Sequence, residues 1–157
     1  MDSLPGEVAV LARSEAVLAA LVDVLPVCSY VRADDAEMLA HWGDDPATTV
    51  IVVDSLGDPR EFSQVAAQVS RRKPIVVFSP TGVTPAMAAL TRVTGVIVVD
   101  GLRDLVDTVR LLACQPLPLG QDGLFGGRVP CSANPEQAVR ALARVAAYVE
   151  WRRAAPA

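Results

Sequence analysis

The sequence predicts an α/β domain, in which helices cover both faces of a parallel β-sheet. Four short runs of apolar residues recur along the first two thirds of the chain, and segments with helical periodicity separate them. Three of these runs consist almost entirely of valine and isoleucine, which is typical of strands that are buried on both faces. Strands that alternate with amphipathic helices indicate right-handed crossovers and a parallel sheet.

Five segments are predicted to be strands. The four clear ones cover residues 7–12, 49–54, 74–79 and 95–100. A weaker segment, residues 27–32, mixes polar residues with valines and fits an edge strand. Five such strands predict a flavodoxin-like three-layer sandwich with the strand order 2-1-3-4-5, in which ligands bind near the carboxyl ends of strands 1 and 3.

Helical periodicity and capping residues predict a helix after each strand. Ser14 and Thr84 are good N-cap residues, and Asp58 is followed by a proline at the first helical position. The predicted helices cover residues 14–25, 34–42, 58–72, 84–93 and 102–114.

The chain changes character after the predicted α/β domain of residues 1–115. Residues 116–133 are rich in proline and glycine and predict a loop or linker, and residues 134–153 predict one more helix. An apolar stripe on this helix is a candidate interaction surface and consists of Val139, Leu142, Ala146 and Val149. The stripe either packs on its own domain or pairs with a second copy of the chain, and the sequence leaves both open.

Composition and charge narrow the class of protein. The chain has 157 residues, 52% hydrophobic and 20% charged, which predicts a single globular domain. Its net charge of −4 argues against nonspecific binding to nucleic acid or to an anionic membrane. No apolar segment reaches the length of a membrane span, and the N-terminus lacks the pattern of a signal peptide. We therefore expect a cytoplasmic protein with no membrane partner and no direct nucleic-acid binding.

Metal-ligating residue types are sparse in the sequence. The three cysteines are Cys28, Cys114 and Cys131, which are widely spaced, and the single histidine is His41. This pattern predicts reduced cysteines and no metal site.

Polar residues follow the predicted strands at the edge where their carboxyl ends should meet. Asp54 ends the third strand, Ser79 the fourth and Asp100 the fifth, while Arg13 and Glu15 follow the first. Asp54 should lie at the centre of this edge. It can also be an ordinary turn residue, because Asp-Ser-x-Gly favours turns, and Ser79 can equally cap a turn or a helix.

The order of the elements and two of these edge residues resemble the receiver domain of bacterial two-component response regulators. The resemblance implies that Asp54 accepts a phosphoryl group and that Ser79 contacts that group. Ala12 and Arg13, however, stand where the family has an acidic pair that holds Mg²⁺, and Asp100 stands in place of a lysine. Phosphoryl transfer depends on a metal and on cations that neutralise charge. These departures therefore predict a degenerate pseudo-receiver.

The predicted function is accordingly a non-catalytic signalling module that binds a protein partner and forms a homodimer. By the same resemblance, dimerisation would use the face formed by the fourth helix, the fifth strand and the fifth helix. Arg13 is expected to pair with Asp54 and to hold a fixed state without phosphate. No cofactor is predicted, and Mg²⁺ is expected only if Asp54 is phosphorylated.

Two other functions stay open at this point. One is an atypical response regulator that is phosphorylated on Asp54 and uses Ser79 and Glu15. The other is a small-ligand or nucleotide sensor that uses the loops after strands 1 and 4. The sequence shows no nucleophile–base pair, so no enzyme is predicted.

Overall fold

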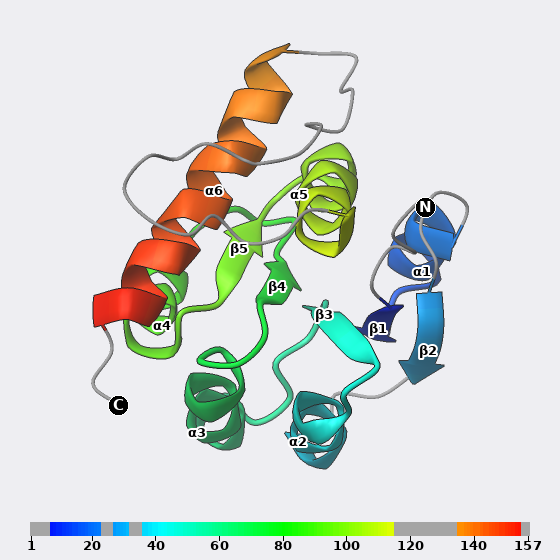
Figure 1. Ribbon diagram of the computed structural model, residues 1–157, viewed down its shortest axis with the longest axis vertical. Coiled ribbons are helices and arrows are strands. Elements are labelled where there is room, and N and C mark those ends of the chain that lie inside the picture. Colours follow the sequence, from blue (N-terminus) through cyan, green and yellow to red (C-terminus); the bar gives the residue numbers. More distant parts are fainter. Residues whose placement is uncertain (1–6, 23–26, 32–35, 115–134, 155–157) are drawn as a thin grey trace.

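Five parallel strands form one sheet with the order β2-β1-β3-β4-β5 (Figure 1). The structure is a computed structural model and describes residues 7–22, 27–31, 36–114 and 135–154. The strands are β1 (Glu7–Leu11), β2 (Val27–Val31), β3 (Thr48–Val53), β4 (Ile75–Phe78) and β5 (Ile97–Val99). Every strand pair is parallel, so the predicted α/β class and the flavodoxin-like arrangement are confirmed.

Six helices lie within the described ranges and flank the sheet. They are α1 (Glu15–Val22), α2 (Ala36–Asp44), α3 (Pro59–Val69), α4 (Pro85–Thr94), α5 (Leu102–Cys114) and α6 (Pro135–Ala154). Helix α2 ends at Asp44, two residues beyond the end of the helix that the sequence predicts over residues 34–42. A Cβ at Gly43 would lie 2.7 Å from Cγ2 of Val69. The glycine therefore allows α2 and α3 to approach closely.

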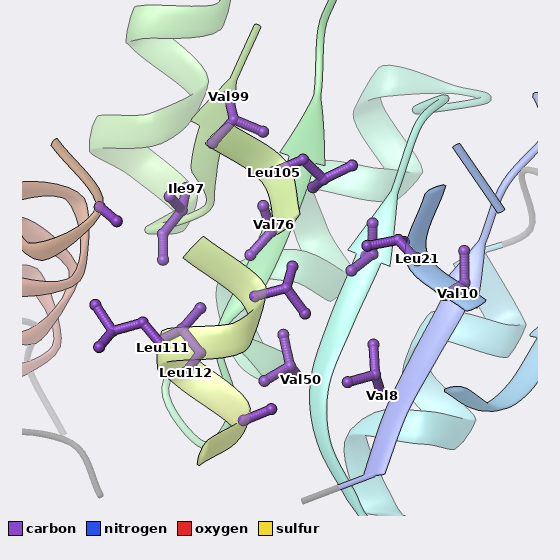
Figure 2. Packing of buried hydrophobic residues seen from close by; sticks show 14 of the residues in the cluster. Val8, Val10, Leu21, Val50, Val76, Ile97, Val99, Leu105, Leu111 and Leu112 are labelled. Atoms are coloured by element: carbon purple, nitrogen blue, oxygen red, sulfur yellow. The ribbon is translucent and has the colours of Figure 1, made fainter. Parts of the chain in front are cut away.

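Alternate residues of the strands face opposite sides of the sheet and build two apolar layers. One layer joins the sheet to α1, α5 and α6, and Figure 2 shows Leu105 of α5 close to Val76 of β4 within it. The other layer packs Ile51 and Val77 against α2 and α3, with α4 at its margin. Because both faces are covered, the central strands must be apolar at nearly every position.

The last helix packs on its own domain. It contacts α5 and β5, and Ala141, Val145 and Tyr148 are its buried residues. Two hydrogen bonds hold its C-terminal half: Tyr148 Oη donates to the carbonyl of Ser70 at 2.5 Å, and Trp151 Nε1 donates to the carbonyl of Arg92 at 3.0 Å. The open question is thus answered in favour of packing within the chain.

The residues of the predicted stripe occupy different environments on this helix. Leu142 and Val149 are partly buried against the core, whereas Val139 is 64% exposed and Ala146 is also exposed. The buried line runs one position earlier than the predicted stripe. Apolar residues surround most of this helix, so periodicity alone does not decide which side faces the sheet.

The surface predicted for dimerisation is occupied in part by α6. This helix crosses α5 and β5 and reaches α4 through Trp151 (Figure 1). The resemblance to receiver domains suggested that α4, β5 and α5 would form a face for a second copy. In this chain α6 occupies the part of that face at α5 and β5. Homodimerisation itself stays a prediction.

Some predictions fall on residues outside the described ranges. These include the loop or linker of residues 116–133, with Cys131, and residue 134, the first of the last predicted helix. Among the residues that are described, no helix is long and apolar enough to cross a membrane.

Candidate functional site at the carboxyl edge of the sheet

Asp54 joins the end of β3 to the loop that follows β1. Its Oδ1 accepts a hydrogen bond from the backbone N–H of Arg13 at 2.8 Å, and its Oδ2 accepts one from the backbone N–H of Ser14 at 2.7 Å. The backbone N–H of Asp54 donates to the carbonyl of Leu11 at 3.2 Å. Both carboxylate oxygens therefore hold the loop that leads from β1 into α1, which begins at Glu15.

Arg13 and Asp54 meet at this edge, as the sequence predicts. The contact that joins them is a hydrogen bond from the backbone N–H of Arg13, and an ion pair of the Arg13 side chain with Asp54 stays a prediction. A short turn after β1 brings two successive N–H groups towards β3, because β1 and β3 are hydrogen-bonded neighbours. The backbone of residues 13 and 14 supplies both donors of this link.

Ser79 takes part in the turn after β4. Its Oγ donates to the carbonyl of Gly82 at 3.1 Å and lies 3.4 Å from Oγ1 of Thr81. Its backbone N–H donates to the carbonyl of Val99 at 2.8 Å, which extends the pairing of β4 with β5. The hydroxyl group therefore holds a turn in which Gly82 has a φ of 87°, a conformation that favours glycine.

The next two helices at this edge carry their own caps. Oδ1 of Asp58 accepts from the backbone N–H groups of Arg60 and Glu61 at the start of α3. Oγ1 of Thr84 accepts from the backbone N–H of Met87 at the start of α4. The predictions of both caps from the sequence are confirmed. Internal acceptors thus occupy donors that helix N-termini otherwise offer to anions.

The remaining predicted edge residues are exposed. Glu15 is the first residue of α1, and Asp100 follows β5 directly. His41 is exposed in the last turn of α2. Within the described part of the chain, no group of three or more His, Cys, Asp or Glu side chains is placed to hold a metal ion.

Charged groups at the opposite end of the sheet join α2 to the segment after α3. Nζ of Lys73 donates to the carbonyls of Trp42 and Asp45, and burial lowers the pKa of this lysine. Nη1 of Arg72 lies 2.6 Å from Oδ1 of Asp44, and this hydrogen bond lowers the pKa of the Asp44 carboxyl. These contacts connect the end of α2 with the segment after α3, away from the carboxyl edge.

A cavity that the sequence analysis missed lies between α4 and α6. It has a volume of about 600 Å³, and its walls include Ala88, Arg92, Arg144 and Trp151. Trp151 also packs on Gly95, the residue that ends α4. In the sequence, the signal for this cavity is the pair of aromatic residues Tyr148 and Trp151 near the end of the last helix. Only the folded chain shows that this pair lies beside α4.

Residues 5–89, which run from the approach to β1 into α4, match the succinyl-CoA ligase like flavodoxin domain. The chain is 34% identical over 89 residues to the alpha subunit of acetate–CoA ligase (ADP-forming) I from Pyrococcus furiosus, which covers 48% of this chain and 19% of that protein. It is 27% identical over 149 residues to 4-hydroxybutyrate–CoA ligase (ADP-forming) from Nitrosopumilus maritimus, which covers 74% of this chain and 21% of that protein.

The same relationship is found among solved structures. The apo form of the dinucleotide forming acetyl-coenzyme A synthetase 1 of Candidatus Korarchaeum cryptofilum superposes with a TM-score of 0.63 and 26% identity. The superposition covers 76% of this chain and 32% of that chain. This chain therefore spans between about a fifth and a third of the length of these relatives.

These matches overturn the resemblance to response-regulator receivers. The two families share the order of strands and helices, and the aspartate after the third strand suggested a phosphoacceptor. Here that aspartate binds the backbone N–H groups of the two residues before α1. The family that matches is a domain found in ligases. We predicted a pseudo-receiver with a role in two-component signalling, and we predicted no enzyme. These predictions are wrong, because the relatives are ADP-forming CoA ligases. The chain belongs to the succinyl-CoA ligase like flavodoxin domain family.

Proposed function

We propose that this chain forms the flavodoxin-like domain of an ADP-forming acyl-CoA ligase. The match of residues 5–89 to the succinyl-CoA ligase like flavodoxin domain carries the proposal. The two curated relatives are both named as ADP-forming CoA ligases, although they differ in the acid that is named. The reaction class is therefore the joining of a small carboxylic acid to CoA with formation of ADP.

The proposed contribution of this domain is a preorganised carboxyl edge. In sheets with this strand order, ligands bind at the edge formed by the carboxyl ends of the strands. The hydrogen bonds of Asp54, Asp58 and Thr84 fix the loops that lead into α1, α3 and α4. Loops held in this way can present a defined surface to a substrate or to a neighbouring domain without a large entropic cost.

The proposed partners are the other domains or subunits of the ligase. This chain spans between about a fifth and a third of its relatives, and one relative is itself named as an alpha subunit. We infer that the complete reaction needs protein regions beyond those that this chain matches. Self-association and a cytoplasmic location remain predictions beside this proposal.

The proposal can be tested on the assembly that the chain forms in its source cells. The tagged chain is purified from those cells, and release of ADP from ATP is measured with and without CoA and a small carboxylic acid such as acetate. Two variants are compared in the same assay. Thr81→Arg places a long side chain on an exposed position at the carboxyl edge, and Ala47→Arg places the same side chain on an exposed position before β3.

The expected result is ADP release that requires both CoA and the acid. Thr81→Arg should lower that rate at least tenfold, whereas Ala47→Arg should leave it within a factor of two. Thermal unfolding of each purified variant checks that the fold is retained. ADP release that is independent of CoA, or an equal effect of the two substitutions, would contradict the proposed role of the carboxyl edge.

A further inference from the structure

The cavity between α4 and α6 starts beside the carboxyl edge, at Val83 and Pro85, and extends along α4 to Gly95. One wall comes from Ala88, Thr91 and Arg92 of α4, and another from Arg144, Ala147 and Trp151 of α6. Residues Gly95 to Val98, which lead into β5, lie between the two helices and also line it. Its volume of about 600 Å³ is within the range of roughly 300–1,000 Å³ that is usual for small-molecule sites.

The walls of the cavity are held in place before any ligand arrives. Nε1 of Trp151 donates to the carbonyl of Arg92 at 3.0 Å, and the indole stacks on Tyr148 with ring centroids 6.5 Å apart. Gly95 lies so close to the indole that a Cβ there would be 2.3 Å from Cε3 of Trp151. A wall fixed by these contacts loses little conformational entropy when a ligand binds.

Most of the lining is apolar, and its charged members are all of one sign. Arg92 and Arg144 are the charged residues that line the cavity, and no aspartate or glutamate is among its described lining residues. Apolar walls with a small number of oriented polar groups are the usual composition of a small-molecule site. A ligand that fits these walls has an apolar body and a negative group.

Arg144 has spare capacity to bind an anion. Its Nη2 lies 3.5 Å from Oδ2 of Asp104, which is a long contact for an ion pair. Its Nη1 is buried and has no hydrogen-bond partner within the described part of the chain. A buried N–H group without a partner is unfavourable, because it has lost its hydrogen bonds to water without gaining others. The Arg144 side chain as a whole is 23% exposed, so a small shift of the guanidinium would bring Nη1 within reach of a carboxylate in the cavity.

We propose that the cavity between α4 and α6 binds a small amphipathic carboxylate, with its hydrocarbon part against the apolar walls and its carboxylate beside Arg144 and Arg92. The two arginines lie on α4 and α6 and outside the loops of the carboxyl edge, and the proposal does not depend on the ligase function. A guanidinium group pairs well with a carboxylate because it presents two parallel N–H donors. The two arginines, therefore, distinguish a carboxylate from a neutral compound of the same shape.

Octanoate is the probe for this proposal, and octanamide is its neutral counterpart. Binding to the full chain is measured by isothermal titration calorimetry and by tryptophan fluorescence. Trp42 is buried in the layer on the other face of the sheet, so a change on binding reports mainly on Trp151. Octanoate should bind saturably with one site per chain, and octanamide should bind at least tenfold more weakly.

Three variants locate the site and separate charge from shape. Arg144→Gln should weaken octanoate binding at least tenfold and leave octanamide binding nearly unchanged. Ala147→Phe fills the cavity from α6 and should abolish binding of both probes. Ala146→Phe places the same ring on an exposed neighbour that does not line the cavity, and it should bind octanoate like the unchanged chain.

Each remaining outcome would overturn the proposal. Equal affinity for octanoate and octanamide would exclude recognition of the carboxylate. Absence of saturable binding to the unchanged chain would exclude the site, and an equal effect of Ala146→Phe and Ala147→Phe would place binding elsewhere. If Arg144→Gln fails to fold, as judged by circular dichroism, Arg92→Gln replaces it with the same expected loss of at least tenfold for octanoate only.

Discussion

Asp54 is the residue whose role changes most between the sequence and the folded chain. As a carboxylate at the end of a strand, it suggested a phosphoryl acceptor. In the structure, its two oxygens receive the backbone N–H groups of Arg13 and Ser14. Hydrogen bonds to a charged group contribute about 1.5–3 kcal/mol each, so this side chain is a structural link between β3 and α1.

Replacement of Asp54 should therefore destabilise the fold. For Asp54→Ala we expect the free energy of unfolding to fall by about 2 kcal/mol or more, because two N–H groups lose a charged acceptor. Urea denaturation followed by circular dichroism measures this change. Asp100→Ala, at an exposed position of the same edge, is the matched control and should change stability by less than about 0.5 kcal/mol. Equal effects of the two substitutions would show that Asp54 does not hold the loop.

Tyr148 provides a pH-dependent part of the stability. Burial raises its pKa from the usual value near 10 to about 12, so the unfolded chain ionises first. The free energy of unfolding therefore keeps its full value below pH 10. It falls by about 1.4 kcal/mol for each pH unit as the pH rises from 10 to 12. Urea denaturation at several pH values in this range should show the decline.

The variant Tyr148→Phe separates this effect from other alkaline changes. It loses the hydrogen bond to the carbonyl of Ser70, so it should be less stable than the unchanged chain by about 1 kcal/mol at neutral pH. Above pH 10 its stability should decline less steeply, and the difference between the two proteins should shrink. Two parallel curves would show that Tyr148 does not titrate in this window.

At the scale of the elements, the packing of α6 on α4 depends on one glycine. Gly95 ends α4 with a φ of 76°, and its backbone N–H donates to the carbonyl of Thr91. The indole of Trp151 occupies the space that a side chain at position 95 would need. Gly95 thus does two things: it adopts the left-handed conformation that ends α4, and it leaves room for Trp151 of α6.

Gly95→Ala should be more harmful than the same change at Gly82. Both glycines have positive φ values, and an L-residue in this conformation costs about 1–2 kcal/mol. At Gly82 no atom lies within 4 Å of the added Cβ, so that cost stands alone. At Gly95 the overlap with Trp151 should add about 1–3 kcal/mol. Chemical denaturation of both variants measures the difference, and equal losses would mean that α6 moves aside without cost.

At the scale of the whole molecule, the two apolar layers share the same strands. Because β1, β3 and β4 contribute side chains to both layers, loss of one layer removes the support of the other. The last helix is predicted from the sequence as a separate segment, yet it contributes Val145 and Tyr148 to one of these layers. We therefore expect α6 and the sheet to unfold together.

The two tryptophans test this cooperativity. Trp42 lies in the layer with α2 and α3, and Trp151 lies on α6 beside the other layer. Single-tryptophan variants, Trp42→Phe and Trp151→Phe, are unfolded in urea and followed by both fluorescence and circular dichroism. Within each variant the two probes should give the same midpoint, as a two-state transition requires. An earlier fluorescence transition of Trp151 would show that α6 detaches first.

The sequence by itself determined the α/β class, the parallel sheet and the caps of α3 and α4, because these depend on local patterns. Continuous runs of valine and isoleucine mark strands covered on both faces, and Asp58 and Thr84 act within one turn of their own helices. It did not determine the family, because receiver domains and this ligase domain share the strand order and a fold does not specify a function.

Only the tertiary structure decided what depends on residues distant in the chain. Asp54 meets the backbone of residues 13 and 14 because β1 and β3 are neighbours. The cavity exists because α6 returns across β5 to α4 and places Trp151 on Gly95. Periodicity shows that a helix has an apolar side, but the partner of that side is set by the packing of the whole chain.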